Sequence, residues 1–261
     1  MTAAAPGPPT REAYLSTIGA ALQVLTAADP ARPVVLGPGT DVAEVMSWAA
    51  VFATGVTEQL SSTALVPRRA PEQAKPLDVA GEKLLGALSR SPSRRPCWSP
   101  SPAVAPQAGF WLRRSAHALS VRAWQVQVAM EVPAALPPWL LLDGIDEHLT
   151  VLLATAAAEP GSATAEAAGT VAVRCTDVPA SWTLRLDPGA VPLPLGVPTG
   201  LVDPAGHVAP ESVSRRGAAS GAASEAVLAA DAATLRLGLA GMVVLPRGTG
   251  SPELLAGLRV R

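Results

Sequence analysis

The chain has 261 residues, of which 49% are hydrophobic and 16% charged, and its formal net charge is −1 at pH 7. This length and apolar fraction allow a core for one large domain or two ordinary ones, and they exclude wholesale disorder. No basic run is interleaved with aromatic residues, which excludes nucleic acid as the expected partner.

Pro- and Gly-rich segments and helix-capping residues mark the boundaries of the first predicted elements. Residues 1–9 are rich in Ala, Pro and Gly, and we expect a disordered tail there. Thr10 is suited to cap a helix that runs to about Ala28. The stretch GPGTDVAEV predicts the start of a second helix, with Thr40 or Asp41 as its cap.

The middle of the chain alternates helical stretches with Pro-rich loops. A short helical piece is expected at 59–65 and a compact helix at 79–88. A central helix begins near Ala105 or Pro106 and ends before the prolines that follow residue 132. Residues 139–157 then form the last expected bundle helix.

The central helix contains the stretch Phe110–Met130, which has no Gly or Pro. Helical spacing places a mixed polar and aromatic set on one face: Trp111, Ser115, Ala118, Arg122 and Gln125. A second face is apolar: Leu112, Ala116, Leu119, Ala123, Val126 and Met130. A helix of this kind is typical of a bundle that also encloses a site.

Residues 158–169 are small and polar, and we expect a linker between two domains. Beyond it, alternating apolar residues predict strands, so residues 170–261 are expected to form a small α+β domain. The expected elements are strands at 170–176, 181–187 and 242–245, a loop at 188–210, a helix after the tandem GAAS motif, and a closing helix at 252–258.

The sequence contains no signal for export or membrane insertion. The segment MTAAAPGPPTRE lacks the basic flank and apolar core of a secretory signal. No run of 18 apolar residues occurs, so no membrane-spanning helix is expected. The two cysteines, Cys97 and Cys175, lie far apart, which favours reduced thiols and a cytoplasmic protein.

The order of these pieces resembles one known family. A helix with FWLRRSAH is followed by DGIDEHLTVLL, then by the hairpin TVAVRCTD–SWTLRL, and then by GAASEAVL. This order is similar to that of the mycothiol-dependent maleylpyruvate isomerase family, from about residue 10 onward. The resemblance implies an α+β protein with a DinB-like four-helix bundle (up-down-down-up type) over residues 10–157. It also implies a thiol-dependent isomerase or transferase with zinc and mycothiol as cofactors.

In that family a divalent metal, usually taken as zinc, lies between bundle helices and activates the thiol. The resemblance places its three protein ligands, two His and one Glu, at Trp48, Ala118 and Arg122 of this chain. Trp and Ala side chains cannot ligate zinc, and Arg stays protonated. We therefore expect no metal in this copy, and we treat the three positions as a candidate ligand pocket. Its neighbours on the helix face are Trp111, Ser115 and Gln125.

Two interpretations of this face stay open. Arg122 could lie over Trp48 in a cation–π contact and bind an anion, or the space could be a filled structural core. The first predicts a degenerate, metal-free family member that binds a small anionic ligand or a protein partner. The alternative is an active metal- and thiol-dependent isomerase or transferase with a rebuilt metal site, for which Asp143, Glu147 and His148 are the candidates.

The remaining polar residues are expected to be structural. His117 is predicted to be partly exposed. The acids of DGIDE are predicted either to form a solvated charged face or to meet Arg113 and Arg114 across the bundle. Neither cysteine has a histidine close to it in sequence, so nucleophilic catalysis by Cys97 or Cys175 is not expected.

Overall fold

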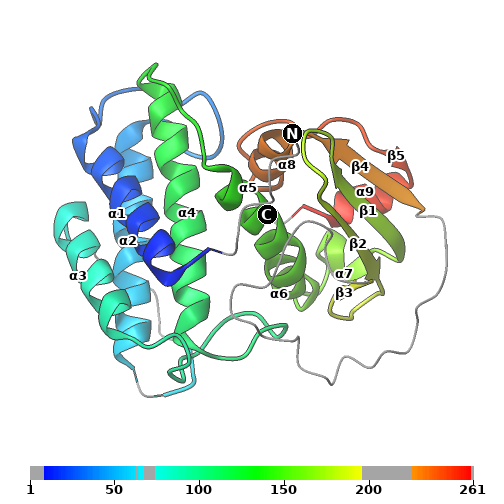
Figure 1. The fold of residues 1–261 in the computed structure, drawn as a ribbon, viewed down its shortest axis with the longest axis horizontal. Coiled ribbons are helices and arrows are strands. Elements are labelled where there is room, and N and C mark those ends of the chain that lie inside the picture. Colours follow the sequence, from blue (N-terminus) through cyan, green and yellow to red (C-terminus); the bar gives the residue numbers. More distant parts are fainter. Residues whose placement is uncertain (1–8, 63, 68–73, 196–224, 260–261) are drawn as a thin grey trace. The chain divides into compact units, whose positions relative to one another are not determined.

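The computed structural model describes residues 9–62, 64–67, 74–195 and 225–259. The chain divides into two compact units, of which the first is Arg11–Leu136 and the second begins at Pro137. The first unit is helical and the second combines helices with a sheet, so the chain is of mixed α and β type (Figure 1). None of the described helices combines the length and hydropathy that a membrane crossing requires. The expected tail lies outside the described residues except for Pro9.

The described part of the first unit holds four helices: α1 (Arg11–Ala27), α2 (Val42–Ser61), α3 (Leu77–Arg90) and α4 (Ala108–Ala129). Helix α1 packs mainly against α3 and α4, and α2 packs against the same two helices. Each helix therefore buries its apolar stripe against two principal neighbours, as in a four-helix arrangement.

The start of α2 is fixed by reciprocal capping. The Asp41 carboxylate accepts a hydrogen bond from the Glu44 amide at 2.9 Å, so Asp41 is the cap. The Glu44 carboxylate in turn accepts from the Thr40 amide at 2.8 Å and from its hydroxyl at 3.1 Å. Both residues proposed for the cap thus satisfy free groups at the helix start. The helix continues to Ser61 and so includes residues 59–61 of the separate piece expected at 59–65.

Helix α4 is buried almost all the way round. The members of its predicted apolar face that lie within the helix are buried: Leu112, Ala116, Leu119, Ala123 and Val126. Ser115, His117 and Gln125 are buried as well, although they lie on other parts of the helix surface. The expectation that His117 is partly exposed is therefore wrong. Its imidazole packs edge-on to the Tyr14 ring at 6.3 Å, because α1 covers this side of α4.

The second unit begins with a continuous helical segment: α5 (Pro138–Glu147), the π-helical turn η1 (His148–Leu152) and α6 (Leu153–Ala157). Its five-stranded sheet has the order β3-β2-β1-β4-β5. The strands are β1 (Gly169–Cys175), β2 (Ser181–Leu186), β3 (Leu193–Pro194), β4 (Ala226–Ala230) and β5 (Thr249–Gly250). The remaining helices are α7 (Ala163–Glu166), α8 (Ala232–Leu239) and α9 (Pro252–Gly257). The predicted hairpin is present as β1 and β2, which pair antiparallel.

The helical segment at 138–157 belongs to the sheet unit, whereas the sequence predicts it as the last bundle helix. Its apolar stripe is Leu142, Ile145, Leu149 and Leu153. These residues form one buried cluster with sheet residues such as Val171, Trp182 and Leu184. The division of the chain therefore lies at Pro137 and not at the expected position after residue 157. An apolar stripe predicts that a helix is buried, but it does not name the surface that buries it.

The expected linker at 158–169 is a packed part of the second unit. It contains α7, and its Thr164 hydroxyl donates a buried hydrogen bond to the Gly257 carbonyl at 2.8 Å. A segment whose side chain is buried and bonded to a distant helix does not act as a free spacer.

Two further elements of this unit differ from the prediction. Ala226–Ala230, expected in a helix, forms strand β4, because parallel pairing with β1 buries its alternate residues. The expected strand at 242–245 is irregular, and the Met242 amide donates to the Leu237 carbonyl at 2.8 Å. The tandem GAAS motif lies outside the described residues, whereas the closing helix is confirmed as α9.

Candidate functional site

The facing surfaces of α2 and α4 bring Trp48 and Arg122 together. The guanidinium carbon of Arg122 lies 4.6 Å from the centroid of the Trp48 ring. The predicted cation–π contact is therefore confirmed, and such a contact stabilises by roughly 0.5–2 kcal/mol. The indole also stacks on Phe52, with ring centroids 5.2 Å apart and an angle of 12° between planes. Trp48 keeps 36% of its surface exposed, so this aromatic group lies at the surface of its unit.

Arg122 and Gln125 hold the connection between α1 and α2. Nη1 of Arg122 donates to the Gln125 side-chain oxygen at 2.9 Å and to the Pro38 carbonyl at 3.2 Å. The Gln125 amide donates to the carbonyls of Leu36 at 2.6 Å and Pro38 at 2.9 Å. The connection can turn back onto α4 because Gly37 adopts a positive φ of 75°.

Among the described residues, no acidic group neutralises the charge of Arg122. Burial lowers the pKa of its guanidinium from the ordinary value. A guanidinium nevertheless stays protonated in proteins. Within the described ranges, its hydrogen-bond acceptors are a carbonyl and an amide oxygen, and no carboxylate pairs with it. The site is therefore a partly buried cation with neutral partners.

The other positions on this face differ in their surroundings. Ala118 is buried and contributes no polar group. Ser115 is fully buried, and its hydroxyl has no hydrogen-bond partner among the described residues. By contrast, the Ser120 hydroxyl donates to the Ala116 carbonyl at 2.6 Å. A buried hydroxyl without a partner is destabilising, by about 1–3 kcal/mol. Ser115 is therefore a second polar group on the Arg122 face that the helix backbone does not satisfy.

Trp111 belongs to a different cluster. Its indole N–H donates to the Trp98 carbonyl at 2.7 Å, and its ring packs edge-on to Phe110 at 4.9 Å. The Trp98 ring lies 6.2 Å from it. Trp111 thus fixes the loop that precedes α4. The structure brings Trp48, Arg122 and Gln125 together and assigns Trp111 to another part of the same helix.

The residues at the expected metal positions do not fit a metal. Trp48 and Ala118 have no donor atom for zinc, and the donors of Arg122 are protonated nitrogens. Over the described residues, no group of three or more His, Cys, Asp or Glu side chains is arranged to hold a metal ion. No reaction step through a metal is derived from this face.

The residues suggested for a rebuilt metal site lie in a buried charged cluster of the second unit. Glu147 is 1% exposed, and Asp143 and His148 are also buried. The predicted solvated charged face of DGIDE is therefore wrong for Asp143 and Glu147. Arg236 of α8 is also buried, at 3% exposed, and its side chain lies beside Gly144 of α5. Buried charges of both signs are gathered where the two helices pack.

Gly144 makes room for Arg236 in this cluster. A Cβ atom at position 144 would lie 2.6 Å from Cδ and 3.0 Å from Cζ of Arg236, which is too close for either atom. His148, next in the chain after Glu147, donates through Nε2 to the Leu258 carbonyl at 2.8 Å. The sequence gives one indication of this cluster, which is that Asp143 and Glu147 flank Gly144 in a helical stretch. Arg236 lies 92 residues after Gly144, so the sequence does not show that it joins the cluster.

Neither cysteine has the properties of a nucleophile. Cys97 is buried with its thiol 3.6 Å from the Gln59 carbonyl, and this burial raises its pKa. Burial, with the carboxylates of Asp177 and Asp231, raises the pKa of Cys175 to about 12. A nucleophilic cysteine requires the thiolate form, which such surroundings oppose at neutral pH.

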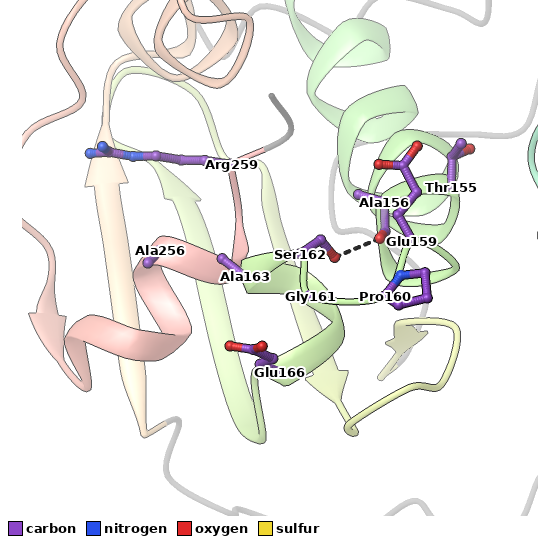
Figure 2. Close-up of a pocket in the computed structure, with 10 residues that line it drawn as sticks. All are labelled: Thr155, Ala156, Glu159, Pro160, Gly161, Ser162, Ala163, Glu166, Ala256 and Arg259. Carbon is purple, nitrogen blue, oxygen red and sulfur yellow. Dashed lines mark hydrogen bonds between the residues drawn. The ribbon is translucent and has the colours of Figure 1, made fainter.

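The second unit also contains a cavity of about 580 Å³ between α6, α7 and α9 (Figure 2). Its charged lining residues are Glu159, Glu166 and Arg259. Figure 2 shows their side chains pointing in different directions, and the Ser162 hydroxyl is turned toward the Ala156 carbonyl at 2.6 Å. The lining does not converge on one point. The sequence prediction treats much of this region as a linker and gives it no functional role.

Comparisons of the chain with protein-family models, with curated proteins and with solved structures found no match. The α2–α4 face offers a guanidinium over an indole ring, with uncharged oxygen atoms as its bonded partners. Such an arrangement can attract and orient an anion.

Proposed function

We propose that this chain is a metal-free member of the mycothiol-dependent maleylpyruvate isomerase family, whose DinB-like helical unit binds a small anionic ligand. One observation supports this proposal above the others. A guanidinium, with its Cζ 4.6 Å from the centroid of an indole ring, occupies the face that the resemblance assigns to the metal. Arg122 and Trp48 are also two of the three positions at which the family's metal ligands are expected.

The electrostatics of Arg122 favour an anion over a neutral ligand. Partial burial makes a charge unfavourable unless it is compensated. The neutral oxygens of Pro38 and Gln125 and the Trp48 ring compensate it only in part. An anion at this position would supply the missing negative charge, with charge-assisted hydrogen bonds that are stronger than neutral ones.

In this proposal Arg122 attracts an anion, as the family's metal ion would, but it does not perform the metal's chemistry. A metal ion activates a bound thiol by lowering its pKa and acts as a Lewis acid. A guanidinium can orient an anion but does not coordinate a thiolate. The function proposed for this face is therefore binding. A protein partner would use the same chemistry if it presented an acidic side chain to Arg122.

The proposal is tested by two measurements on the natively purified chain. Elemental analysis should find far less than one zinc or nickel per chain, and stoichiometric metal would overturn the metal-free interpretation. Isothermal titration with small anions should show one binding site per chain. The variant Arg122→Gln should weaken that binding by roughly tenfold or more, as expected for a lost charge-assisted hydrogen bond. Unchanged binding in Arg122→Gln would contradict the proposed site.

A further inference from the structure

We propose that Ser93 is a phosphorylation site, at which Arg11 and the start of α4 receive the phosphate. The modification transfers the γ-phosphoryl group of ATP to Oγ of Ser93 and requires a protein serine kinase. The bond from the γ-phosphorus to its bridging oxygen breaks, a bond from phosphorus to Oγ forms, ADP leaves, and a base of the kinase takes the hydroxyl proton. Ser93 precedes α4 and takes no part in the Arg122 site, so the proposed anion binding and this modification stand or fall separately.

Ser93 carries an accessible hydroxyl in the arginine-rich loop between α3 and α4. The loop continues from the last turn of α3 with the sequence SRSPSRR, residues 89–95, and Ser93 is exposed there. Ser91 is 8% exposed, and its hydroxyl accepts a hydrogen bond from Nη1 of Arg95 at 3.3 Å. Ser89 still belongs to α3. Because a kinase must reach the acceptor hydroxyl, Ser93 is the better substrate of the three.

The sequence around Ser93 is basic. Arg90 lies three residues before it, and Arg94 and Arg95 follow it directly. Residues 83–130 contain no Asp or Glu. Charge patterns are one means by which a kinase selects its substrates. This pattern therefore suits a kinase whose substrate-binding surface is acidic.

Arg11, in the first turn of α1, is already turned toward this hydroxyl. Its Nη1 lies 3.4 Å from Oγ of Ser93. Its Nη2 donates to the carbonyls of Leu88 and Ser89, at 2.5 Å and 3.0 Å, so the guanidinium is held at the end of α3. A phosphate on Ser93 would therefore meet an ordered guanidinium, and hydrogen bonds between arginine and phosphate are stronger than those between neutral groups.

The start of α4 is the second feature that favours a phosphate at this position. The Gly109 amide donates to the Ser93 carbonyl at 2.8 Å, and a Cβ at position 109 would lie 3.3 Å from Cβ of Ser93. The Ser93 side chain thus lies beside the first turn of a 22-residue helix. This turn contains no acidic residue, and the Gln107 side chain, at the N-cap, makes no capping bond. A phosphate would supply the negative charge that the positive end of the helix dipole favours.

The first test incubates the full chain with MgATP and an arginine-directed serine kinase, and maps the phosphorylated residues by mass spectrometry. Phosphate should enter at Ser93. The variant Ser93→Ala should lose this phosphate, whereas the matched control Ser91→Ala should keep it. Phosphate at Ser91 or Ser89 in place of Ser93, or none within residues 89–95, would overturn the proposal.

The second test asks whether Arg11 receives the phosphate, and it uses phosphorus NMR of the modified chain. The second pKa of a phosphoserine is about 6, and a neighbouring guanidinium lowers it by favouring the dianion. Arg11→Gln should therefore raise the phosphate pKa toward the free value, whereas Arg32→Gln, at an exposed arginine between α1 and α2, should not change it. Equal values in the three proteins would overturn the role of Arg11.

A measurement without substitution covers the case in which Arg11→Gln folds poorly. The phosphate pKa of the modified chain should be lower in the folded state than in concentrated urea, because unfolding separates the phosphate from Arg11 and from the start of α4. Equal values in the two states would overturn the proposed receiving site.

Discussion

At Arg122, a guanidinium stands where the resemblance to the isomerase family would have a metal-ligating histidine. Two features of its surroundings fix the cation: an indole ring centred 4.6 Å from its Cζ, and two oxygen atoms that accept hydrogen bonds from one nitrogen. Gln125, one turn further along α4, fixes the same connection through Leu36 and Pro38. The residue therefore orders a backbone segment, and in the proposed function its charge also attracts the anionic ligand.

A prediction at this scale concerns Gly144, which lies under the buried Arg236. Gly144→Ala should lower the free energy of unfolding by about 2–4 kcal/mol, because a methyl group would collide with Arg236 and displace a buried charge. Urea denaturation followed by circular dichroism measures this. The control is Gly19→Ala in α1, where an added Cβ has no atom within 4 Å. That change should be neutral or stabilising, by up to about 1 kcal/mol. Equal effects of the two changes would contradict the assigned role of Gly144.

The sequence predicts a contact between residues of two helices only where the family resemblance aligns both helices. It placed Arg122 opposite Trp48 because the resemblance aligned two helices at defined positions, and the contact is present. The sequence does not predict the burial of Glu147 or His117, because the helix α8 that packs on α5 and the Tyr14 ring that packs on His117 are distant in sequence. A charged residue with no visible partner is best assigned to solvent, and only the tertiary structure shows otherwise.

Among the elements, α8 shows how a cap links stability to pH. The Asp231 carboxylate accepts from the Thr234 hydroxyl at 2.7 Å and from its amide at 2.9 Å. These two bonds, the hydroxyl first, lower the pKa of Asp231. A pKa that is lower in the folded state means that the stabilisation is complete above the unfolded pKa, which is about 3.9. It is lost as the pH falls through the folded value.

We therefore predict that Asp231→Asn removes part of the acid sensitivity of the second unit. Asparagine is also a good N-cap, so the melting temperature near pH 7 should change little. As the pH falls below about 4, the unmodified chain should lose more stability than the variant, because only aspartate is protonated there. Thermal melts over this range provide the measurement. Parallel pH profiles for the two proteins would show that the cap does not contribute.

The elements differ in how well local sequence predicts them. The hairpin of β1 and β2 follows from alternating residues on either side of a short turn, and it is present. Strand β4 has an Ala-rich sequence, AVLAA, that suits a helix equally well. Its parallel pairing with β1 decides the outcome, and that partner lies more than 50 residues away. The burial of helix 138–157 was predictable from its apolar stripe, but its partner surface was not.

For the whole molecule, the division at Pro137 separates the Arg122 face from the buried charged cluster and the cavity. This division predicts which N-terminal fragment of the chain folds stably by itself. Residues 1–136 should give a folded, monomeric helical protein that still binds anions. Residues 1–157 should self-associate, because Leu142, Ile145, Leu149 and Leu153 would lack the sheet residues that bury them. Light scattering after size exclusion distinguishes the two. A monomeric 1–157 and an unfolded 1–136 would restore the boundary predicted from sequence.

The relation of the α2–α4 face to the family's metal site is tested most directly by restoring the ligands. The triple variant Trp48→His, Ala118→Glu, Arg122→His should contain about one zinc per chain by elemental analysis after native purification, and it should lose anion binding. The double variant Trp48→His, Ala118→Glu keeps the arginine and should contain far less zinc than one per chain. A triple variant that folds, as judged by circular dichroism, but gains no metal would contradict the account, because the three side chains would not then meet at a metal site.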